Sequence, residues 1–288
     1  MAKLLDVKNL SIAFGGLKAV DSLSFDINEK EVYGLIGPNG AGKTTVFNCL
    51  TQFYKPDTGE IEFIDNEGKK INLETLEVHD VIKHGIVRTF QNVELVRELT
   101  ILENVMIGGQ IRYKSNLLDV FFNSGRLKKE EDALEERAKE VLKKLELDHL
   151  MYLPAGGQPY GVQKKVELAR TLMLNPKLII LDEPAAGLND TETAELADTI
   201  KLISQEMDCA IMLVEHDMGL VMKICDRICA ISFGKKLAIG TPAEIQANKD
   251  VQEAYLGVSE EELEEELEEV IEKGEKETDH VEEVSHEE

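Results

Sequence analysis

Hydrophobic and polar residues alternate with different periods in different parts of this chain. Residues 4–33 combine short apolar runs with turn residues, which predicts β-strands with hairpin turns at Gly15-Gly16 and Asn28-Glu29. The segment GEIEFIDNEGKKI, residues 59–71, predicts a second hairpin. Apolar residues recur at helical spacing over residues 43–53 and 116–150, so helices are expected there.

After residue 160 the pattern alternates helices with short apolar strands. A helix is predicted to about Leu174, where Asn175-Pro176 ends it. The strand KLIILDE, a helix over about 191–206, the strand CAIMLVEH, another helix and a hairpin of RICAISFG and KKLAIG follow. Continuous apolar strands are typical of sheets buried on both faces. The order therefore predicts an α/β fold with a doubly wound parallel sheet.

Composition places the chain among globular proteins and makes nucleic acid an unfavourable partner. It has 288 residues, 43% of them hydrophobic, and a net charge of −24. Residues 259–288 hold 16 acidic residues and 2 lysines, a net charge of −14, which leaves about −10 for the rest. Phosphate backbones require clustered Lys and Arg, so we expect no nucleic acid partner. The longest apolar runs fall short of the ~20 residues that span a bilayer. Lys3, Asp6 and Lys8 interrupt any signal-peptide core. A cytoplasmic location is therefore expected.

The four cysteines lie in apolar surroundings. Cys225 and Cys229 would share a face if their segment were helical, which permits a metal pair, but there is no CxxC motif to support one. We expect buried free thiols.

The segment GPNGAGKTT fits the phosphate-loop pattern G-x-x-x-x-G-K-[ST]. It follows an apolar strand and precedes a helical pattern, a context that favours a phosphate site over a chance glycine-rich turn. Backbone N–H groups and the helix dipole would bind the phosphates of ATP, Lys43 would bridge the β- and γ-phosphates, and the Thr44 hydroxyl would ligate Mg²⁺. The candidate ATP-binding residues of this loop are Gly37, Pro38, Asn39, Gly40, Ala41, Gly42, Lys43, Thr44 and Thr45.

The segment LIILDEP ends a buried strand in two carboxylates, Asp182 and Glu183. Beside a phosphate loop, Asp182 is expected to hold Mg²⁺ and Glu183 to polarise the attacking water; the alternative is a strand-end turn with two solvated acids. His216 closes the next strand. A lone histidine there is more often structural, but both strand ends fall on one sheet edge, where a donor to the γ-phosphate is useful. Gln91, in VRTFQN, is uninformative alone.

Together these residues resemble the ATP-binding subunits of ABC transporters over residues 3–257. The resemblance implies an ABC-type P-loop ATPase with a RecA-like parallel-sheet core, an N-terminal antiparallel β subdomain and a helical subdomain at about 92–172, followed by an acidic tail at 258–288. It implies that Gln91 senses Mg²⁺ and the membrane subunit, that His216 is the switch histidine, and that Phe14 stacks on adenine. AAGLND is similar to the D-loop, with Asn189 replacing the usual Asp.

The subtype resembles branched-chain amino acid uptake, in its longer, LivG-type ATPase. The segments that carry this are FGGLKAVDSLSF, GIVRTFQNVELVRELTILENV, DEPAAGLN, EHDMGLVMKICDRI and GTPAEIQANKDVQEAYLG. Importers of urea and short amides share much of the pattern, so the substrate stays open. The implied partners are a second ABC ATPase subunit, identical or not, and integral-membrane permease subunits, which would place the chain on the inner face of the cell membrane.

The family's signature segment, usually LSGGQ, is altered in AGGQPYGVQKKVELAR. Counting back from VELAR places its five positions at 158–162, so the eye-catching GGQ at 156–158 is out of register and is expected to be loop. Pro159 then replaces the serine, at a cost of one hydrogen bond to a charged group, ~1.5–3 kcal/mol at most. Backbone N–H groups and the helix dipole would still hold a partner's γ-phosphate; the alternative is a plain amphipathic helix start. The signature residues expected to act on the partner's ATP are Pro159, Tyr160, Gly161, Val162 and Gln163.

Two other functions fit parts of the sequence. A regulatory subunit that binds ATP with little turnover would suit Pro159 and Asn189, but Glu183, Gln91 and His216 argue against it. Soluble ABC ATPases of translation or repair generally carry two cassettes or long coiled-coil insertions, which this chain lacks. In the acidic tail, apolar residues recurring every four positions permit a short helix, although its charge density favours a solvated, disordered segment.

Overall fold

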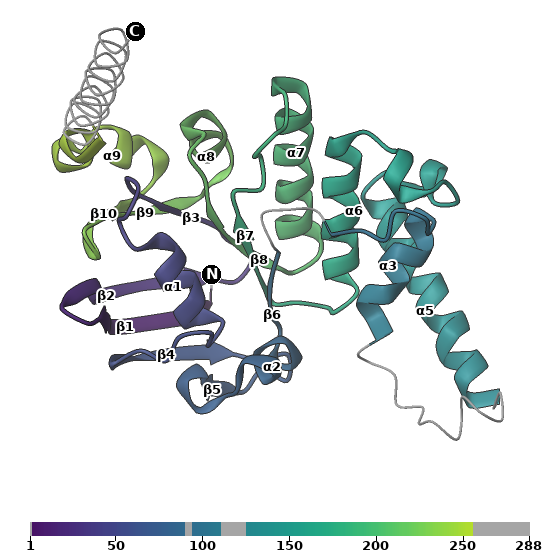
Figure 1. Ribbon diagram of the computed structural model, residues 1–288, viewed down its shortest axis with the longest axis horizontal. Coiled ribbons are helices and arrows are strands. Elements are labelled where there is room, and N and C mark those ends of the chain that lie inside the picture. Colours follow the sequence, from purple (N-terminus) through teal and green to yellow (C-terminus); the bar gives the residue numbers. More distant parts are fainter. Residues whose placement is uncertain (1, 90–93, 111–124, 256–288) are drawn as a thin grey trace, which may run out of the picture.

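The computed structural model describes residues 2–89, 94–110 and 125–255. Its N-terminal part is an antiparallel sheet of strand order β2-β1-β4-β5, seen at the lower left of Figure 1. These strands are β1 (Lys3–Phe14), β2 (Leu17–Asn28), β4 (Thr58–Ile64) and β5 (Lys70–Asn72). The predicted hairpins at Gly15-Gly16 and at residues 59–71 are both confirmed.

The predicted hairpin at Asn28-Glu29 is wrong. The chain does turn there, but β3 (Val32–Ile36) belongs to a second sheet. It pairs there in parallel with β8 (Ala210–Val214) and β9 (Arg227–Ser232). All five residues of β3 are buried, as expected for a strand covered on both faces. A local turn signal says that the chain reverses, not which sheet receives the next strand.

The second sheet has the strand order β10-β9-β3-β8-β7-β6. Its remaining strands are β6 (Ile86–Arg88), β7 (Leu178–Asp182), β8 (Ala210–Val214), β9 (Arg227–Ser232) and β10 (Lys235–Gly240). All neighbours pair in parallel except β9 and β10, which form the predicted final hairpin. The parallel pairing brings the carboxyl ends of β3, β7 and β8 to one edge, where ligands bind in such sheets.

Most of the helices lie on one side of this sheet (Figure 1). The helices are α1 (Lys43–Leu50), α2 (Val78–Val81), α3 (Ile101–Gly109), α5 (Gly125–Lys144), α6 (Tyr160–Leu172), α7 (Asp190–Glu206), α8 (Met218–Ile224) and α9 (Pro242–Gln246). The helices predicted after residues 43, 160 and 191 are confirmed. Capping boxes begin α3, α7 and α9, each satisfying N–H groups that a helix start leaves unpaired.

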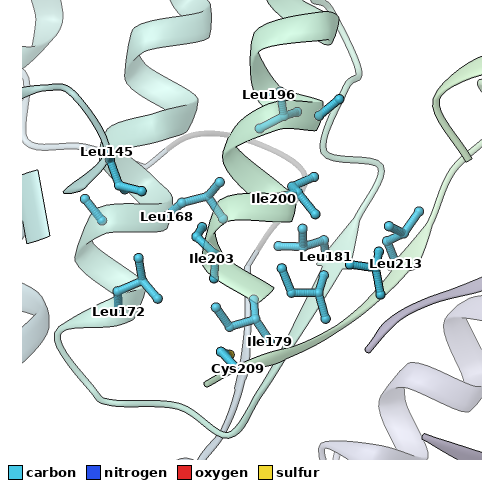
Figure 2. Close-up of a cluster of buried hydrophobic side chains, with 14 of the residues drawn as sticks. Leu145, Leu168, Leu172, Ile179, Leu181, Leu196, Ile200, Ile203, Cys209 and Leu213 are labelled. Atoms are coloured by element: carbon cyan, nitrogen blue, oxygen red, sulfur yellow. The ribbon is translucent and has the colours of Figure 1, made fainter. Parts of the chain in front are cut away.

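Alternate residues of the central strands pack into two separate hydrophobic cores. On one face, Ile179, Leu181 and Leu213 pack toward α6 and α7, where Leu172 and Ile200 meet them (Figure 2). On the other face, the next residues along the same strands pack against the N-terminal sheet and α1: Leu178, Ile180, Met212 and Val214. Both faces of these strands are therefore covered by apolar side chains, as the continuous apolar runs in the sequence predicted.

In the described ranges, no helix is long and apolar enough to cross a membrane. Helices α3, α5 and α6 pack on one another beside the central sheet, in the region expected to form a helical subdomain. The predicted acidic tail, residues 258–288, lies outside the described residues.

Candidate functional site

The phosphate loop joins β3 to α1, and its backbone conformation favours glycine at Gly40 and Gly42. Gly42 ends the loop with φ 101°, and a Cβ there would lie 2.4 Å from the carbonyl oxygen of Ala19. Gly40 also has positive φ, 74°, and has nothing within 4 Å of the Cβ position, so it faces open space. The loop therefore packs tightly against β2 at Gly42, while the space beside Gly40 is open.

Lys43 lies inside this curl. Its Nζ donates hydrogen bonds to the carbonyl oxygens of Gly37 at 2.6 Å and Pro38 at 2.9 Å. Burial lowers the pKa of the Lys43 ammonium, and the carboxylates of Glu183 and Asp182 oppose that shift. A buried cation that hydrogen-bonds to neutral carbonyls, in a loop of backbone donors, provides the chemistry that fits a polyphosphate.

A cavity of about 440 Å³ opens beside the loop and brings together residues that the sequence predicted separately. Its walls include Lys43 and Thr44 from α1, Glu183 after β7, His216 after β8, and Phe14 at the end of β1. The ring of Phe14 is 46% exposed and meets Tyr54 edge-on, with 5.2 Å between ring centroids. The cavity is of the size that holds a small-molecule ligand, and its exposed aromatic wall suits a planar base.

The acidic pair is divided between two environments by the backbone. Asp182 is the last residue of β7, and Glu183 follows it in the left-handed region, with φ 48°. The Glu183 N–H donates to the carbonyl oxygen of Val214 at 2.9 Å, which fixes this strained residue to the end of β8. The Glu183 Oε1 lies 3.3 Å from His216 Nε2. A carboxylate and an imidazole are thus in contact at the cavity wall. The sequence predicted that the two strand ends share one sheet edge, which the parallel pairing of β7 and β8 confirms, but it did not predict this contact.

Arg88, the last residue of β6, binds the other acid of the pair. Its NH2 donates to Asp182 Oδ2 at 2.6 Å, its NH1 donates to Asn48 Oδ1 on α1 at 2.7 Å, and its guanidinium lies over the Phe47 ring. Both charged side chains of the pair are largely buried. Arg88 was not predicted from the sequence, where the available signal was a cation at the end of the apolar strand GIVR, which indicates a buried anionic partner.

Glu215 is a second residue that the sequence analysis missed. It is buried, and its Oε1 accepts from the Ala185 N–H at 2.6 Å while its Oε2 accepts from the His216 N–H at 3.1 Å. Burial raises the pKa of this carboxyl, against the hydrogen bonds that it accepts. It ties the loop after Glu183 to the end of β8, so it holds the two residues of the carboxylate–imidazole contact in place. An acid between an apolar strand and a histidine was the available signal.

The signature segment begins α6, well to the right of α1 in Figure 1. Residues 155–157 form a 3₁₀ turn, and α6 starts at Tyr160 with Pro159 as its N-cap, so the GGQ precedes the helix, as the register predicted. Pro159 gives no side-chain cap. The Gly161 N–H in the first turn of α6 donates to Glu192 Oε1 on α7 at 3.2 Å.

The cysteines are buried free thiols, as the sequence predicted, and the shared helix face that would have permitted a metal pair is not formed. Cys225 follows α8 and Cys229 lies in β9, so they share no helix. Within residues 2–89, 94–110 and 125–255, no cluster of three or more His, Cys, Asp or Glu side chains is arranged to hold a metal.

Comparison with known proteins shows which family this chain belongs to. Residues 20–186 match the family described as ABC transporter, and residues 235–261 match the family described as branched-chain amino acid ATP-binding cassette transporter. The chain belongs to the ABC transporter family. It is 42% identical over 254 residues to the high-affinity branched-chain amino acid transport ATP-binding protein LivG of Escherichia coli strain K12. The aligned residues cover 88% of this chain and 98% of that relative.

Solved ABC cassettes share the fold. The ADP conformation of MJ1267, an ATP-binding cassette of an ABC transporter, superposes with a TM-score of 0.75 at 32% identity, covering 89% of this chain and all of that one. A dimeric, post-hydrolysis state of the cassette MJ0796 bound to ADP and Pi superposes with a TM-score of 0.64 at 26% identity, covering 83% of this chain and 99% of that one. These findings confirm the family, the fold and the ATPase class predicted from the sequence. Gln91, the expected Q-loop residue of this ABC chain, lies outside the described residues.

Proposed function

We propose that this ABC subunit binds and hydrolyses ATP to drive the import of branched-chain amino acids. One observation carries the catalytic part: the phosphate loop, Glu183 and His216, from separate elements, line one cavity. The relatives named for branched-chain amino acid transport carry the substrate part. The second family match also supports the substrate part, because it covers a C-terminal segment rather than the motifs that all ABC cassettes share.

The residues of the cavity divide the work by their chemistry. The N–H groups of the phosphate loop and Lys43 would bind the phosphates, with the Lys43 ammonium exchanging its carbonyl partners for phosphate oxygens. Phe14 would stack on the base. Glu183 would accept the proton of the attacking water as general base. His216, already in contact with Glu183, would orient the Glu183 carboxylate and donate a hydrogen bond to the γ-phosphate.

Mg²⁺ fits the oxygen donors at the same edge. The Thr44 hydroxyl is exposed at the start of α1, and Asp182 offers Oδ1 beside the oxygen that Arg88 holds; hydroxyl and carboxylate oxygens are ligands that Mg²⁺ prefers. Thr44, Asp182 and Gln91 would hold the ion, which when bound neutralises charge on the transferring phosphoryl group.

The partners follow from how the site is divided. The signature residues Pro159, Tyr160, Gly161, Val162 and Gln163 start α6, away from this chain's own phosphate loop, so they would complete the ATP site of a second ATPase subunit. The dimeric neighbour with ADP and Pi supports such pairing. Permease subunits would then hold the pair on the inner face of the membrane.

The test is ATP hydrolysis by the purified chain and by Glu183→Gln. Loss of the general base should lower the turnover rate roughly 10²- to 10⁴-fold, while binding of a fluorescent ATP analogue stays within about twofold. Glu140→Gln, an exposed acid on α5, is the matched control and should hydrolyse ATP at the normal rate. Equal rates for Glu183→Gln and the unchanged chain would refute the assignment of the base.

The substrate is tested in the assembled importer. With its permease subunits and second ATPase in vesicles, a binding protein loaded with leucine should stimulate ATP hydrolysis. Stimulation by urea or a short amide, and not by leucine, would replace the amino acid in this proposal without changing the ATPase.

A further inference from the structure

One carboxylate binds the starts of two helices at the signature segment. Glu192 is the third residue of α7, where its Oε2 accepts from the Asn189 N–H at 3.2 Å and from Asn189 Nδ2 at 2.9 Å. Its other oxygen, Oε1, accepts from the Gly161 N–H of α6 at 3.2 Å. Glu192 therefore acts as a capping residue for its own helix and, at the same time, as an anion bound to the signature helix.

The contact with α6 is close. A Cβ added to Gly161 would lie 3.0 Å from Glu192 Cγ and 3.1 Å from its Oε1, so the side chain lies directly over the first turn of the helix. Negative charge is favourable there because the first N–H groups and the helix dipole present a partial positive charge. Pro159, as N-cap, provides no side-chain acceptor for this turn, so the carboxylate from α7 does so.

The same N–H has a second role under the proposed function, on which this inference rests. In the dimer, the first turn of α6 would bind the γ-phosphate of the partner's ATP. One N–H cannot donate fully to a carboxylate and a phosphate, and two anions at one helix start repel each other. Closure of the dimer therefore requires that Glu192 leave Gly161.

We propose that Glu192 occupies the γ-phosphate position of the signature segment in the separated subunit, and is displaced from Gly161 when ATP closes the dimer. It is a positioning residue: it acts through Gly161, keeping the first turn of α6 formed before a phosphate arrives. Closing the dimer includes displacing this carboxylate. The charge on Glu192 therefore raises the ATP concentration at which the dimer forms.

Asn189 explains how the carboxylate is held. Its Nδ2 donates to Glu192 Oε2, and its Oδ1 accepts from the Glu192 N–H at 3.0 Å. An aspartate at this position, usual in the resembled D-loop, has no donor and would repel the carboxylate. The Asn at 189 thus anchors Glu192 in the orientation that reaches Gly161.

The experiment measures the ATP concentration for half-maximal dimer formation, in the hydrolysis-deficient Glu183→Gln chain, by light scattering after gel filtration. Both the chain alone and its mixture with the second ATPase of its importer are measured. Glu192→Gln keeps the side-chain length and the carbonyl acceptor for Gly161 but removes the charge. Because the charge that interacts with this helix start is removed, the ATP requirement should fall about three- to tenfold, which corresponds to about 0.65–1.4 kcal/mol at 1.36 kcal/mol per tenfold.

Glu195→Gln is the matched control. It removes the same charge one turn further along α7, where Glu195 pairs with Lys165 at 2.7 Å, and should leave the ATP requirement unchanged. Unfolding of each variant by urea separates loss of the cap from the effect on closure. If Glu192→Gln leaves the ATP requirement unchanged, raises it, or lowers it no more than Glu195→Gln, the inference is overturned while the proposed function stands. If the Glu183→Gln chain forms no ATP-dependent dimer in either sample, both are overturned.

Discussion

The buried acid of the signature helix makes folding stability depend on pH in an unusual direction. Glu167 lies on α6, is 5% exposed, and has its pKa raised by burial from 4.5 to about 7, although Lys164 and Arg170 oppose the shift. A carboxyl whose folded pKa exceeds its unfolded pKa binds more protons in the folded state between those two values. Its contribution therefore favours folding at low pH and is lost as the pH rises from 4.5 to 7.

The size of this effect follows from the shift. A difference of about 2.5 pKa units corresponds to about 3 kcal/mol, at 1.36 kcal/mol per unit. At pH 5.5, one unit above the unfolded pKa, ionisation has already lowered the free energy of unfolding by about 1.4 kcal/mol. At pH 8 the whole reduction of about 3 kcal/mol is present. Glu167→Gln is nearly isosteric and removes the titration. Its stability relative to the unchanged chain should therefore increase by about 2 kcal/mol between pH 5.5 and pH 8.

Urea unfolding followed by far-ultraviolet circular dichroism, without nucleotide, measures this at both pH values. The lower pH stays above the sequence pI of about 4.7, where the chain would be least soluble. Glu140→Gln, an exposed change on α5, should differ from the unchanged chain by less than about 0.5 kcal/mol at either pH. A Glu167→Gln difference that is the same at pH 5.5 and pH 8 would refute the claim that this acid is buried at a cost.

Two further predictions concern other buried groups. Arg88→Met should lower the turnover rate of ATP hydrolysis with little change in ATP affinity, and should destabilise the fold by about 1.5–3 kcal/mol, because Asp182 loses a charged hydrogen bond. Arg88→Lys should recover part of the rate. An unchanged rate in Arg88→Met would show that the ion pair does not position Asp182. Burial raises the pKa of all four cysteines to about 12, so at pH 8 a thiol reagent such as DTNB should label the four only in denaturant; rapid labelling of the native chain would contradict their burial.

The parts of the fold that the sequence could predict are those that depend on neighbours along the chain. Three such parts carry their signal within about ten residues: the phosphate loop, the strand that ends at Asp182, and the helix after Asn189. The failed hairpin at Asn28-Glu29 depended on long-range pairing: β3 inserts between β8 and β9, which are more than 170 residues away. A pattern of period two marks a strand but does not contain the identity of its neighbours.

The candidate site divides in the same way. Motif residues could be named from the sequence because each type has one use at a phosphate site. Arg88 and Glu215 could not, because their roles come from contacts across the sheet: Arg88 reaches Asp182 on a neighbouring strand and Asn48 on α1, and Glu215 reaches Ala185. Both are charged residues at the ends of apolar strands, so the sequence indicated that each needs a partner and left the partner unspecified.

The two departures from the family pattern, Pro159 and Asn189, are related through Glu192. Taken alone, Pro159 removes an acceptor from the start of α6, and Asn189 removes a charge from the start of α7. In the structure, Asn189 uses its amide to hold the Glu192 carboxylate, and that carboxylate serves the Gly161 N–H beside Pro159. An aspartate at 189 would repel the carboxylate, and a serine at 159 would compete with it for the same turn. Residues that share one partner are not additive, so the strength of this signature depends on all three residues together and cannot be judged from the missing serine.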